Sequence, residues 1–437
     1  MTVPHIVVVG GGAGGLELVT TLARKMARKG RARVTLVERN RSHIWKPLLH
    51  EVAAGSLDSS LDEVGYASHA HRWGYSYYYG DVEDIDRETR ELVLAPMVDE
   101  DGKEIMGRHR LAFDYLVMAV GSISNDFGTP GVREHCAMLD RRKEAEHFRR
   151  RMLYQCLRVS RQLTKDPSTD PAVRIAIVGG GATGVELAAE LYNAADALKH
   201  YGLEEFDRQR MKVTLLEAGP RILPALPDDL AAAAHQELEK LGVRVMCATA
   251  VGEVTEAGML AKSGELIEAD LKVWAAGVCG PDFLERIGGL ETTRNRQLVV
   301  RKTLQTTIDE RIFAIGDCCS CPRGEGETPV PPRAQAAHQM ATHVAANLQR
   351  LLDNEPLTDY AYKDHGSLVS MSRFSTVGSL MGNLVGGRMA IEGRLARLVY
   401  VSLYRMHLVA IHGFLRAGMM ILVGHINQVV RPKLKLH

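Results

Sequence analysis

Residues 6–18 read IVVVGGGAGGLEL and residues 174–190 read RIAIVGGGATGVELAAE, so one pattern occurs twice in the chain. In each copy an apolar, β-branched run precedes a G-x-G-x-x-G spacing, and a helical pattern follows. Such a run is typical of a buried parallel strand. The glycines allow a tight turn and a close approach of the backbone to a pyrophosphate, which the helix N-terminus attracts. Each copy therefore predicts a cradle for a dinucleotide.

An acidic residue follows each copy at the end of a second predicted strand. Glu38 ends the strand in RVTLVERN, and Glu217 ends the strand in KVTLLEAG. A carboxylate at this place accepts hydrogen bonds from ribose hydroxyls and repels a 2′-phosphate. The alternative is a pair of glycine-rich turns without ligands, which the repetition of the complete pattern disfavours. The sequence thus predicts two bound dinucleotides.

The composition and the sequence pattern argue against a nucleic-acid-binding protein, a signal peptide and an ordinary membrane span. The 437 residues carry a net charge of +1, which gives no general footprint for nucleic acid. The N-terminus leads directly into a strand, so we expect no signal peptide, and the odd number of cysteines, 7, fits a reducing compartment. No run of 18 consecutive apolar residues occurs, which argues against an ordinary membrane span.

Alternating strands and helices predict an α/β fold. The segments FDYLVMAVGS (113–122) and LKVWAAGV (271–278) are predicted closing strands of the first and second units, and a charged helix is expected over 141–165. A further strand, RIFAIGDC (311–318), ends at Asp317. This carboxylate is expected to bind a ribityl chain or pyrophosphate, with a helix N-cap as the alternative.

Together these features resemble the two-dinucleotide-binding flavoprotein reductases. The resemblance implies two Rossmann-like domains, with FAD in the first cradle and NADH in the second, and with the NADH-binding domain inserted in a split FAD-binding domain. The expected divisions are 1–165 and 296–390 for the FAD-binding domain, 166–295 for the NADH-binding domain, and 391–437 for a C-terminal amphipathic region.

A closer resemblance is to the bacterial type II NADH dehydrogenases, which are NADH:quinone oxidoreductases that pump no protons. It covers essentially the whole chain and rests on HIWKPLLHEVAAG (43–55), GSISNDFGTPG (121–131), GGGATGVELAAEL (179–191), PPRAQAAHQ (331–339), YKDHGSLVS (362–370) and the C-terminal LYRMH…RPKLKLH. One departure is His365, where many relatives carry lysine; it makes the local electrostatics uncertain. The resemblance implies FAD-dependent oxidation of NADH with electron transfer to a membrane quinone.

Other functions remain as alternatives. A flavoprotein that binds NADH as a redox sensor would need no electron acceptor. A sulfide:quinone oxidoreductase needs a redox cysteine pair with one member in the C-terminal half, but no cysteine follows Cys321. A disulfide reductase needs a C-x-x-x-x-C soon after the first cradle, whereas the first cysteine here is Cys136.

The resemblance implies the residues of the FAD site. Lys46 is expected near FAD, where its charge would stabilise negative charge on the flavin, unless it is a solvated surface lysine. The complete expected set is Gly10, Gly12, Ala13, Gly14, Gly15, Glu38, Arg39, Lys46, Pro47, Val82, Ala119, Gly121, Asp317, Ala334 and Gln335.

The NADH site and the reacting groups follow in the same way. The set expected at NADH is Gly179, Gly181, Gly184, Glu186, Glu217, Ala276 and Gly277. Glu186 is expected to handle protons, or else to stabilise its helix as a first-turn acid. Gln335 and Gln339 lie four residues apart on one helix face and are expected to bond a quinone carbonyl, unless they are ordinary helix residues. His365 is expected beside the flavin and quinone.

Cys318, Cys319 and Cys321 form a CCSC cluster. Structural zinc needs four ligands, and no second C-x-x-C is present, so we expect no metal and regard these cysteines as small residues beside a strand. A soft ion such as copper stays an open alternative.

The C-terminus is basic and apolar. From Gly393 to His437 there are seven Arg or Lys and no Asp or Glu. On a helical wheel, Arg394, Arg397, Arg405, His412 and Arg416 share an arc of about 100°. Gly413 and Gly418 predict breaks in the helix. We expect this segment, with Lys433 and Lys435, to lie on an anionic lipid surface.

This placement predicts a peripheral protein on the cytoplasmic face of the bacterial inner membrane, where it would meet its quinone. The alternatives are that the tail packs in the protein core, forms a dimer interface or crosses the membrane. Besides the quinone and the anionic lipid surface, a second copy of the chain, in a homodimer, is a candidate partner.

Overall fold

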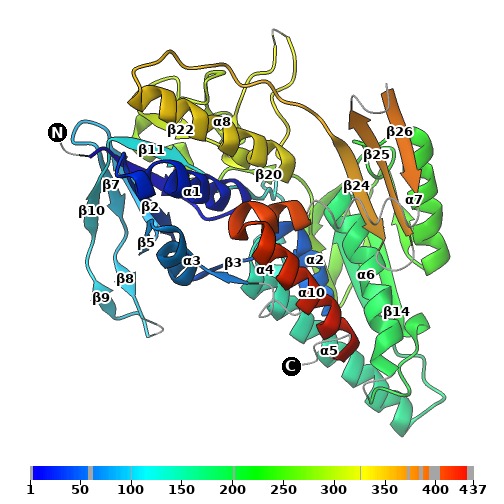
Figure 1. The fold of residues 1–437 in the computed structure, drawn as a ribbon. Helices are drawn as coiled ribbons and strands as arrows, with labels where there is room; N and C mark the ends of the chain where they lie inside the picture. The colour runs from blue at the N-terminus through cyan, green and yellow to red at the C-terminus, as the bar shows by residue number, and fades with distance from the viewer. Residues whose placement is uncertain are drawn as a thin grey trace.

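Two parallel β-sheets, one after each glycine turn, organise the chain (Figure 1). The computed structural model describes residues 3–57, 63–99, 101–199, 202–324, 326–371, 375–382, 387–392 and 404–430. The first sheet has the order β22-β11-β1-β2-β5, with bounds β1 His5–Val9, β2 Arg33–Glu38, β5 Ser76–Tyr79, β11 Tyr115–Met118 and β22 Ile312–Ala314. The second has the order β15-β14-β13-β19, with bounds β13 Val173–Val178, β14 Met211–Leu216, β15 Arg244–Met246 and β19 Leu271–Trp274.

Both central strands are apolar because both faces of each sheet are covered. Every residue of β1 is buried, as are five of the six residues of β13. Val9 pairs with Val37 and Met118, so three strands of the first sheet end at one level. Strand β22 joins this sheet beside β11, although the whole second sheet intervenes in the sequence. The chain therefore returns to its first unit after completing its second.

Helices cover these sheets, and α1 packs against α8 (Figure 1). The α-helices are α1 Ala13–Lys25, α2 Leu49–Ala54, α3 Tyr66–Trp73, α4 Val132–His135, α5 Arg142–Lys165, α6 Ala182–Leu198, α7 Asp228–Leu241, α8 Ala334–Leu352 and α10 Phe414–Val430. The charged helix expected over 141–165 is confirmed as α5. Both glycine turns lead into a helix, α1 in the first unit and α6 in the second.

Small antiparallel sheets complete the molecule. They comprise β6 Val82–Asp86, β7 Glu91–Leu94 and β10 His109–Ala112; β16 Val251–Val254, β17 Gly258–Ala261 and β18 Leu266–Glu268; and β24 Gly366–Met371, β25 Ser375–Gly382 and β26 Gly387–Glu392. The last of these packs against α6 and α7 of the second unit. Strand β12 (Ile123–Ser124) pairs with β20 (Val278–Cys279), which ties the end of the first sheet to the end of the second.

The described part of the tail forms two helices. The first spans 404–412, and α10 follows after Gly413, whose φ of +80° suits glycine. The expected break at Gly413 is confirmed. The expected break at Gly418 is wrong, because α10 continues through it. Arg394, Arg397, Lys433 and Lys435 lie outside the described residues. Among the helices that are described, none combines the length and apolar character needed to cross a membrane.

A buried carboxylate fastens the 404–412 helix to the first unit. Glu17 of α1 accepts a hydrogen bond from His407 Nδ1 at 2.7 Å and another from His338 of α8. His407 also meets His43 through their Nε2 atoms at 3.1 Å, and His43 Nδ1 contacts the carbonyl of Gly11 at 2.9 Å. This chain of side chains therefore connects the tail with the first glycine turn.

The contacts within this chain of side chains shift the pKa values of Glu17, His338 and His43. Burial by itself raises the pKa of Glu17, but hydrogen bonds from His338 and His407 leave that pKa below its usual value. The hydrogen bond to Glu17 raises the pKa of His338. Burial and the neighbouring His407 lower the pKa of His43 to about 3, so His43 is neutral at ordinary pH.

We predict that Glu17→Gln destabilises the protein by about 1.5–3 kcal/mol, the range for hydrogen bonds to a charged group. Stabilisation from the lowered pKa of Glu17 is lost as pH falls below 4.5, and stabilisation from the raised pKa of His338 is lost as pH rises above 6.5. In denaturant titrations, the difference in unfolding free energy between the wild type and the Glu17→Gln variant should therefore be largest between pH 4.5 and pH 6.5. The exposed Glu88→Gln serves as control, and a difference independent of pH contradicts the assignment.

A second prediction concerns the first glycine turn. A Cβ at Gly15 would stand 1.9 Å from the carbonyl oxygen of Gly10, whereas a Cβ at Gly12 would meet nothing within 4 Å. Gly15→Ala should therefore cost about 1–3 kcal/mol of stability, as overpacking does. Gly12→Ala should leave the stability of the protein without ligands unchanged in the same denaturation experiment. Equal effects of the two substitutions would refute this account of the turn.

Candidate functional site

One large cavity joins the two glycine turns to the tail. Its volume is about 2990 Å³, and its walls include Gly12 of the first turn, Gly181 of the second, and residues Tyr404 and Met419 of the tail. Ligand pockets for drug-sized molecules occupy about 300–1,000 Å³. The cavity therefore has room for more than one large ligand.

The first turn has the geometry of a dinucleotide cradle. Gly10 has a φ of +99°, and a Cβ there would lie 2.4 Å from the carbonyl oxygen of Ala119 on the neighbouring strand. Gly12 faces open space, so its backbone is accessible to a ligand. Glu38 accepts hydrogen bonds from the N–H of Gly11 at 2.6 Å and of Asn40 at 2.9 Å. These residues fit the pyrophosphate and ribose of FAD.

The second turn repeats this arrangement. Gly179 has a φ of +114°, and a Cβ on Gly184 would lie 2.0 Å from the Gly179 carbonyl oxygen. Glu217 accepts from the N–H of Gly180 at 2.7 Å and of Gly219 at 2.6 Å. Gly181 faces open space, as Gly12 does. The residues present therefore fit a second dinucleotide.

The residues expected at FAD and those expected at NADH differ in how many of them line the cavity. All of those expected at FAD line it. Of those expected at NADH, Gly181, Glu186 and Gly277 line it. The others are not part of its wall, and these are Gly179, Gly184, Glu217 and Ala276. Gly179, Gly184 and Glu217 fix the backbone of the second turn through their contacts with one another and with Gly180 and Gly219.

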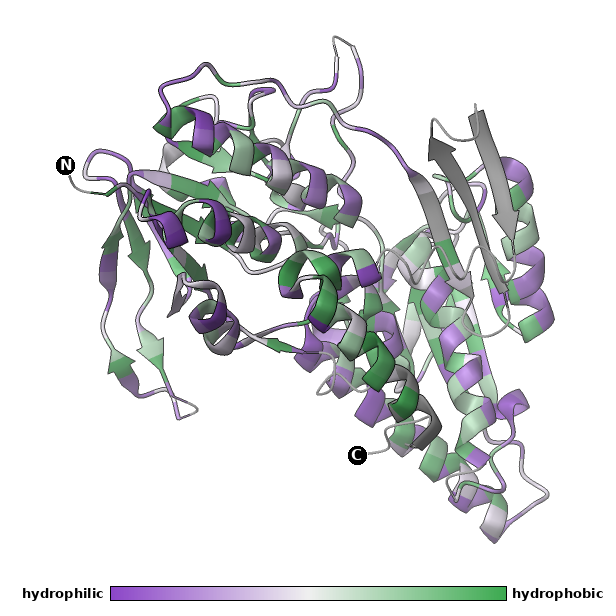
Figure 2. Cartoon of the chain, in the orientation of Figure 1, coloured by the Kyte–Doolittle hydropathy of each residue, from purple (hydrophilic) through white to green (hydrophobic). Residues whose placement is uncertain are grey.

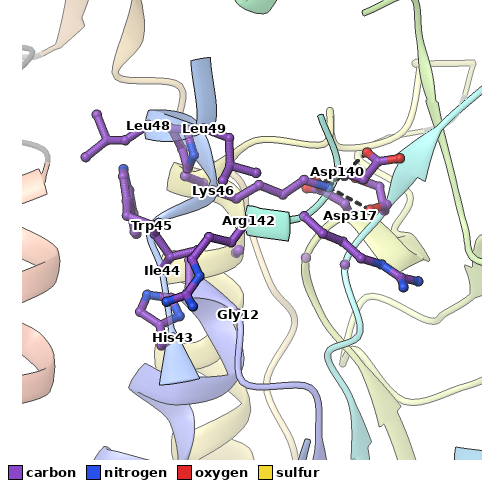
Figure 3. Close-up of a pocket in the computed structure, with 18 of the residues that line it drawn as sticks. Gly12, His43, Ile44, Trp45, Lys46, Leu48, Leu49, Asp140, Arg142 and Asp317 are labelled. Atoms are coloured by element: carbon purple, nitrogen blue, oxygen red, sulfur yellow. Dashed lines mark hydrogen bonds and ion pairs between the residues drawn. The ribbon is translucent and has the colours of Figure 1, made fainter. Parts of the chain in front are cut away.

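Lys46 reaches the end of the first sheet, where Asp317 lies (Figure 3). Its Nζ donates to the carbonyl of Ser122 at 2.8 Å and lies 3.5 Å from Asp140 Oδ1. The hydroxyl of Ser122 donates to Asp317 Oδ2 at 2.8 Å. Burial raises the pKa of Asp317 although Ser122 and Lys46 oppose that shift. The contacts with Ser122 and Asp140 thus hold the Lys46 side chain at the cavity wall.

Glu186 lies in the second unit, in α6, and faces α2. Its Oε1 accepts from the N–H of Ser370 at 3.0 Å, and its Oε2 lies 3.6 Å from Nδ1 of His50. His50 is buried, lines the cavity, and lies 3.9 Å from the half-exposed Glu51 through its Nε2. Burial lowers the pKa of His50 to about 4, with Glu190 opposing the shift. Glu186 therefore has a neutral imidazole as its neighbour.

The two glutamines of α8 are already hydrogen-bonded. Gln335 donates to Asp364 and to the carbonyl of Gly366, and it accepts from the N–H of His365 at 3.0 Å. Gln339 bonds both the N–H and the carbonyl of Lys363. Both amides hold the 363–366 segment against α8. His365 is exposed and lines the cavity beside them.

The cysteine cluster lies behind the cavity rather than in its wall. Cys318, Cys319 and Cys321 are buried, and burial raises the pKa of Cys318 to about 11. All seven cysteines fall in described segments, and none of them lines the cavity. Among the described residues, no three His, Cys, Asp or Glu side chains converge at metal-binding distance.

Five residues of the cavity wall have no role predicted from the sequence. These are Glu17, His43, His50, His338 and His407, which come from segments up to 390 positions apart. Each lies in the first glycine pattern or in a segment that carries the family resemblance. Those segments indicate no contact between the five side chains, because only the packing of the helices brings them together.

Comparisons with known proteins identify the family. A family model described as pyridine nucleotide-disulphide oxidoreductase matches residues 4–341. A type II NADH:quinone oxidoreductase of Haemophilus influenzae is 45% identical over 443 residues, which cover 99% of this chain and 100% of that one.

Two solved structures share the fold. NDH2 from Plasmodium falciparum in complex with NADH has a TM-score of 0.81 at 18% identity and covers 99% of this chain and 100% of that one. The sulfide:quinone oxidoreductase of Aquifex aeolicus has a TM-score of 0.72 at 17% identity, over 98% and 95% of the two chains. Because both identities are low, these structures establish the fold, and the full-length sequence relative decides the family. The chain belongs to the pyridine nucleotide-disulphide oxidoreductases and, within them, to the type II NADH:quinone oxidoreductase family.

Proposed function

We propose that this protein oxidises NADH and reduces a membrane quinone, without pumping protons, using FAD in the first cradle and NADH in the second. The observation that carries this proposal is the single cavity that runs from both cradles to the tail. Bound FAD supplies the two-electron chemistry between nicotinamide and quinone. The chain itself binds and orients the two dinucleotides and limits access of water.

The domain assignment belongs to the same proposal. Residues 1–165 and 296–390 would form the FAD-binding domain, and residues 166–295 the NADH-binding domain. The return of β22 to the first sheet supports the split. Residues 391–437 would form the membrane-associated region.

Nucleotide choice is assigned to Glu217. Its carboxylate is held by two backbone N–H groups, so it cannot easily turn away from a 2′-phosphate. Arg221 offers no compensation, because its guanidinium donates to the carbonyls of Leu223 and Leu226 and pairs with Asp228 at 3.0 Å. These contacts favour NADH over NADPH.

The test uses the purified, FAD-loaded protein with a soluble quinone. NADH should be consumed only when the quinone is present, with a higher kcat/KM for NADH than for NADPH. Glu217→Gln should reduce that ratio by about tenfold or more, since 1.4 kcal/mol of lost repulsion already gives tenfold. Glu239→Gln, exposed on α7, is the control. Rapid NADH consumption without quinone, or equal use of both nucleotides by the wild type, would refute the proposal.

Four residues are assigned to the reacting end of the cavity. Glu186 would hold or move a proton beside His50, and His365 would lie against the quinone. Gln335 and Gln339 would act mainly as positioning residues, because their amides fasten the 363–366 segment. This assignment replaces direct bonding of a quinone carbonyl as the main role of the two amides.

Gln335→Leu removes the three hydrogen bonds that seat Asp364, His365 and Gly366. We expect oxidation by quinone to slow by about tenfold, which corresponds to about 1.4 kcal/mol, or roughly the net worth of one of these hydrogen bonds. Reduction by NADH should stay close to the wild-type rate. Stopped-flow absorbance separates the two half-reactions, and Gln162→Leu, exposed on α5, is the control. Loss of FAD, or equal slowing of both, would show a purely structural role.

The tail is assigned to the membrane surface. Phe414, Leu415, Leu422, Val423 and Ile426 of α10 are all more than half exposed. Figure 2 shows this helix mostly in hydrophobic colours. An exposed apolar helix face is typical of interfacial helices. Because α10 also lines the cavity, the quinone would enter from the bilayer without crossing water. We place the protein at the cytoplasmic face of the inner membrane, as a peripheral protein.

Leu422→Ser combined with Ile426→Ser should weaken binding to lipid vesicles by about tenfold for each residue, since burial of such a side chain contributes at least 1.5 kcal/mol. Both side chains are largely exposed, at 63% and 54%, so folding should be unaffected. The matched control is Leu266→Ser with Ile308→Ser, which are exposed at 47% and 50% and do not line the cavity. Vesicle sedimentation measures the effect. Unchanged binding of the α10 variant would exclude this helix as the anchor.

A further inference from the structure

Three arginines surround the indole of Trp73, at the end of α3. The guanidinium carbons of Arg24, Arg28 and Arg72 lie 5.6, 5.3 and 5.2 Å from the ring centroid. Trp73 is buried, while Arg24 and Arg28 are exposed. The indole thus organises three positive charges that come from two helices and the turn after α1. With Arg416 of α10 they form what we call the Trp73 arginine cluster.

Protein carboxylates do not neutralise this cluster. Within the described residues, none of its four guanidinium groups has an ion pair. Arg28 donates to the carbonyls of Arg72 and Trp73, and Arg72 donates to the carbonyl of His412. Burial is the main cause that lowers the pKa of Arg72, and repulsion from Arg416 and Arg28 lowers this pKa further. The chain as a whole carries only +1, so this is a local concentration of charge.

The cluster lies directly beside the apolar start of α10. Trp73 Nε1 donates to the carbonyl of Ile411 at 2.8 Å, and His69 Nε2 contacts the same oxygen at 2.9 Å. These contacts fix the end of the 404–412 helix against α3. Immediately after Gly413, the chain presents Phe414 and Leu415, which are 86% and 77% exposed. Arg416 follows at once. A large apolar tip and unpaired guanidinium groups therefore share one surface.

The arginines and the exposed apolar side chains beside them together indicate which kind of ligand binds this surface. Guanidinium groups bind phosphate oxygens in a bidentate manner, and cation–π contact with Trp73 holds the arginine planes in place. A soluble phosphate compound would use the charges and leave Phe414 and Leu415 in water. The surface of an anionic membrane satisfies both, with phosphates at the arginines and acyl chains at the apolar tip.

We propose that Arg24, Arg28, Arg72 and Arg416 bind the phosphate groups of anionic lipids, so that the ends of α1 and α3 face the membrane together with α10. This inference rests on the membrane docking proposed above and adds a lipid-selective site on the nucleotide-binding part of the chain. It also orients the protein, because a cluster on one unit and a helix in the tail define a plane of contact.

The test compares the full-length, FAD-loaded protein with an Arg24→Gln/Arg416→Gln variant. Neither arginine makes a hydrogen bond or ion pair among the described residues, so folding should be retained, and NADH oxidation with a soluble quinone checks it. The control, Arg244→Gln/Arg301→Gln, removes the same net charge where each arginine pairs with a surface glutamate. Sedimentation is measured with vesicles of phosphatidylcholine alone and of phosphatidylglycerol and phosphatidylcholine in equal parts.

We expect the wild type to prefer the anionic vesicles, and the cluster variant to bind them about 25-fold more weakly, or about fivefold per arginine. Both forms should bind phosphatidylcholine vesicles alike, and added salt should remove the wild-type preference. The control should stay within twofold of wild type. Equal losses in cluster variant and control, or no preference for anionic vesicles, would overturn the inference while leaving α10 docking intact. A wild type that binds neither vesicle would overturn both.

Discussion

The hydrogen bond from a glycine N–H to the carboxylate at the end of the neighbouring strand is the constraint on which both halves of the molecule depend. Glu38 holds Gly11 at 2.6 Å, and Glu217 holds Gly180 at 2.7 Å. Each bond fixes the acid beside its turn, at the edge where the parallel strands end. In the proposed function the same carboxylates would also present oxygen to a ribose, because a carboxylate oxygen accepts more than one hydrogen bond. In each unit, one carboxylate would therefore both hold the glycine turn and bind the ribose.

The second organising contact is the one between α1 and the tail. Glu17 follows the first glycine turn, and through His407 it holds the 404–412 helix over the cavity. A buried carboxylate without such partners would be costly, so the tail helix and the turn stabilise each other. This coupling explains how a segment far along the chain comes to line a cavity that begins at the first cradle.

The tail also separates two kinds of surface. Its inner face buries Leu408 and Ile411, and His407 and the carbonyl of Ile411 form hydrogen bonds with the first unit. Its outer face exposes apolar side chains of α10, with the Trp73 arginine cluster beside them. A membrane on that side would bring the mouth of the cavity and the lipid phase together. Under the proposed function, this arrangement would let a quinone pass from the bilayer into the cavity.

The sequence by itself determined the two cradles, their acids and the α/β order, because glycine spacing, strand patterns and acid positions are local properties with local causes. Lys46, Asp317 and Gln335, which the resemblance implies at FAD, line the cavity. Only the tertiary structure decided what those groups contact: the amides of Gln335 and Gln339 hold the 363–366 segment, and α10 runs through Gly418. It alone assembled Glu17 with His338 and His407, and the arginines around Trp73. Such contacts join segments that lie from 24 to 390 positions apart, and they depend on helix packing, which no spacing along the chain encodes.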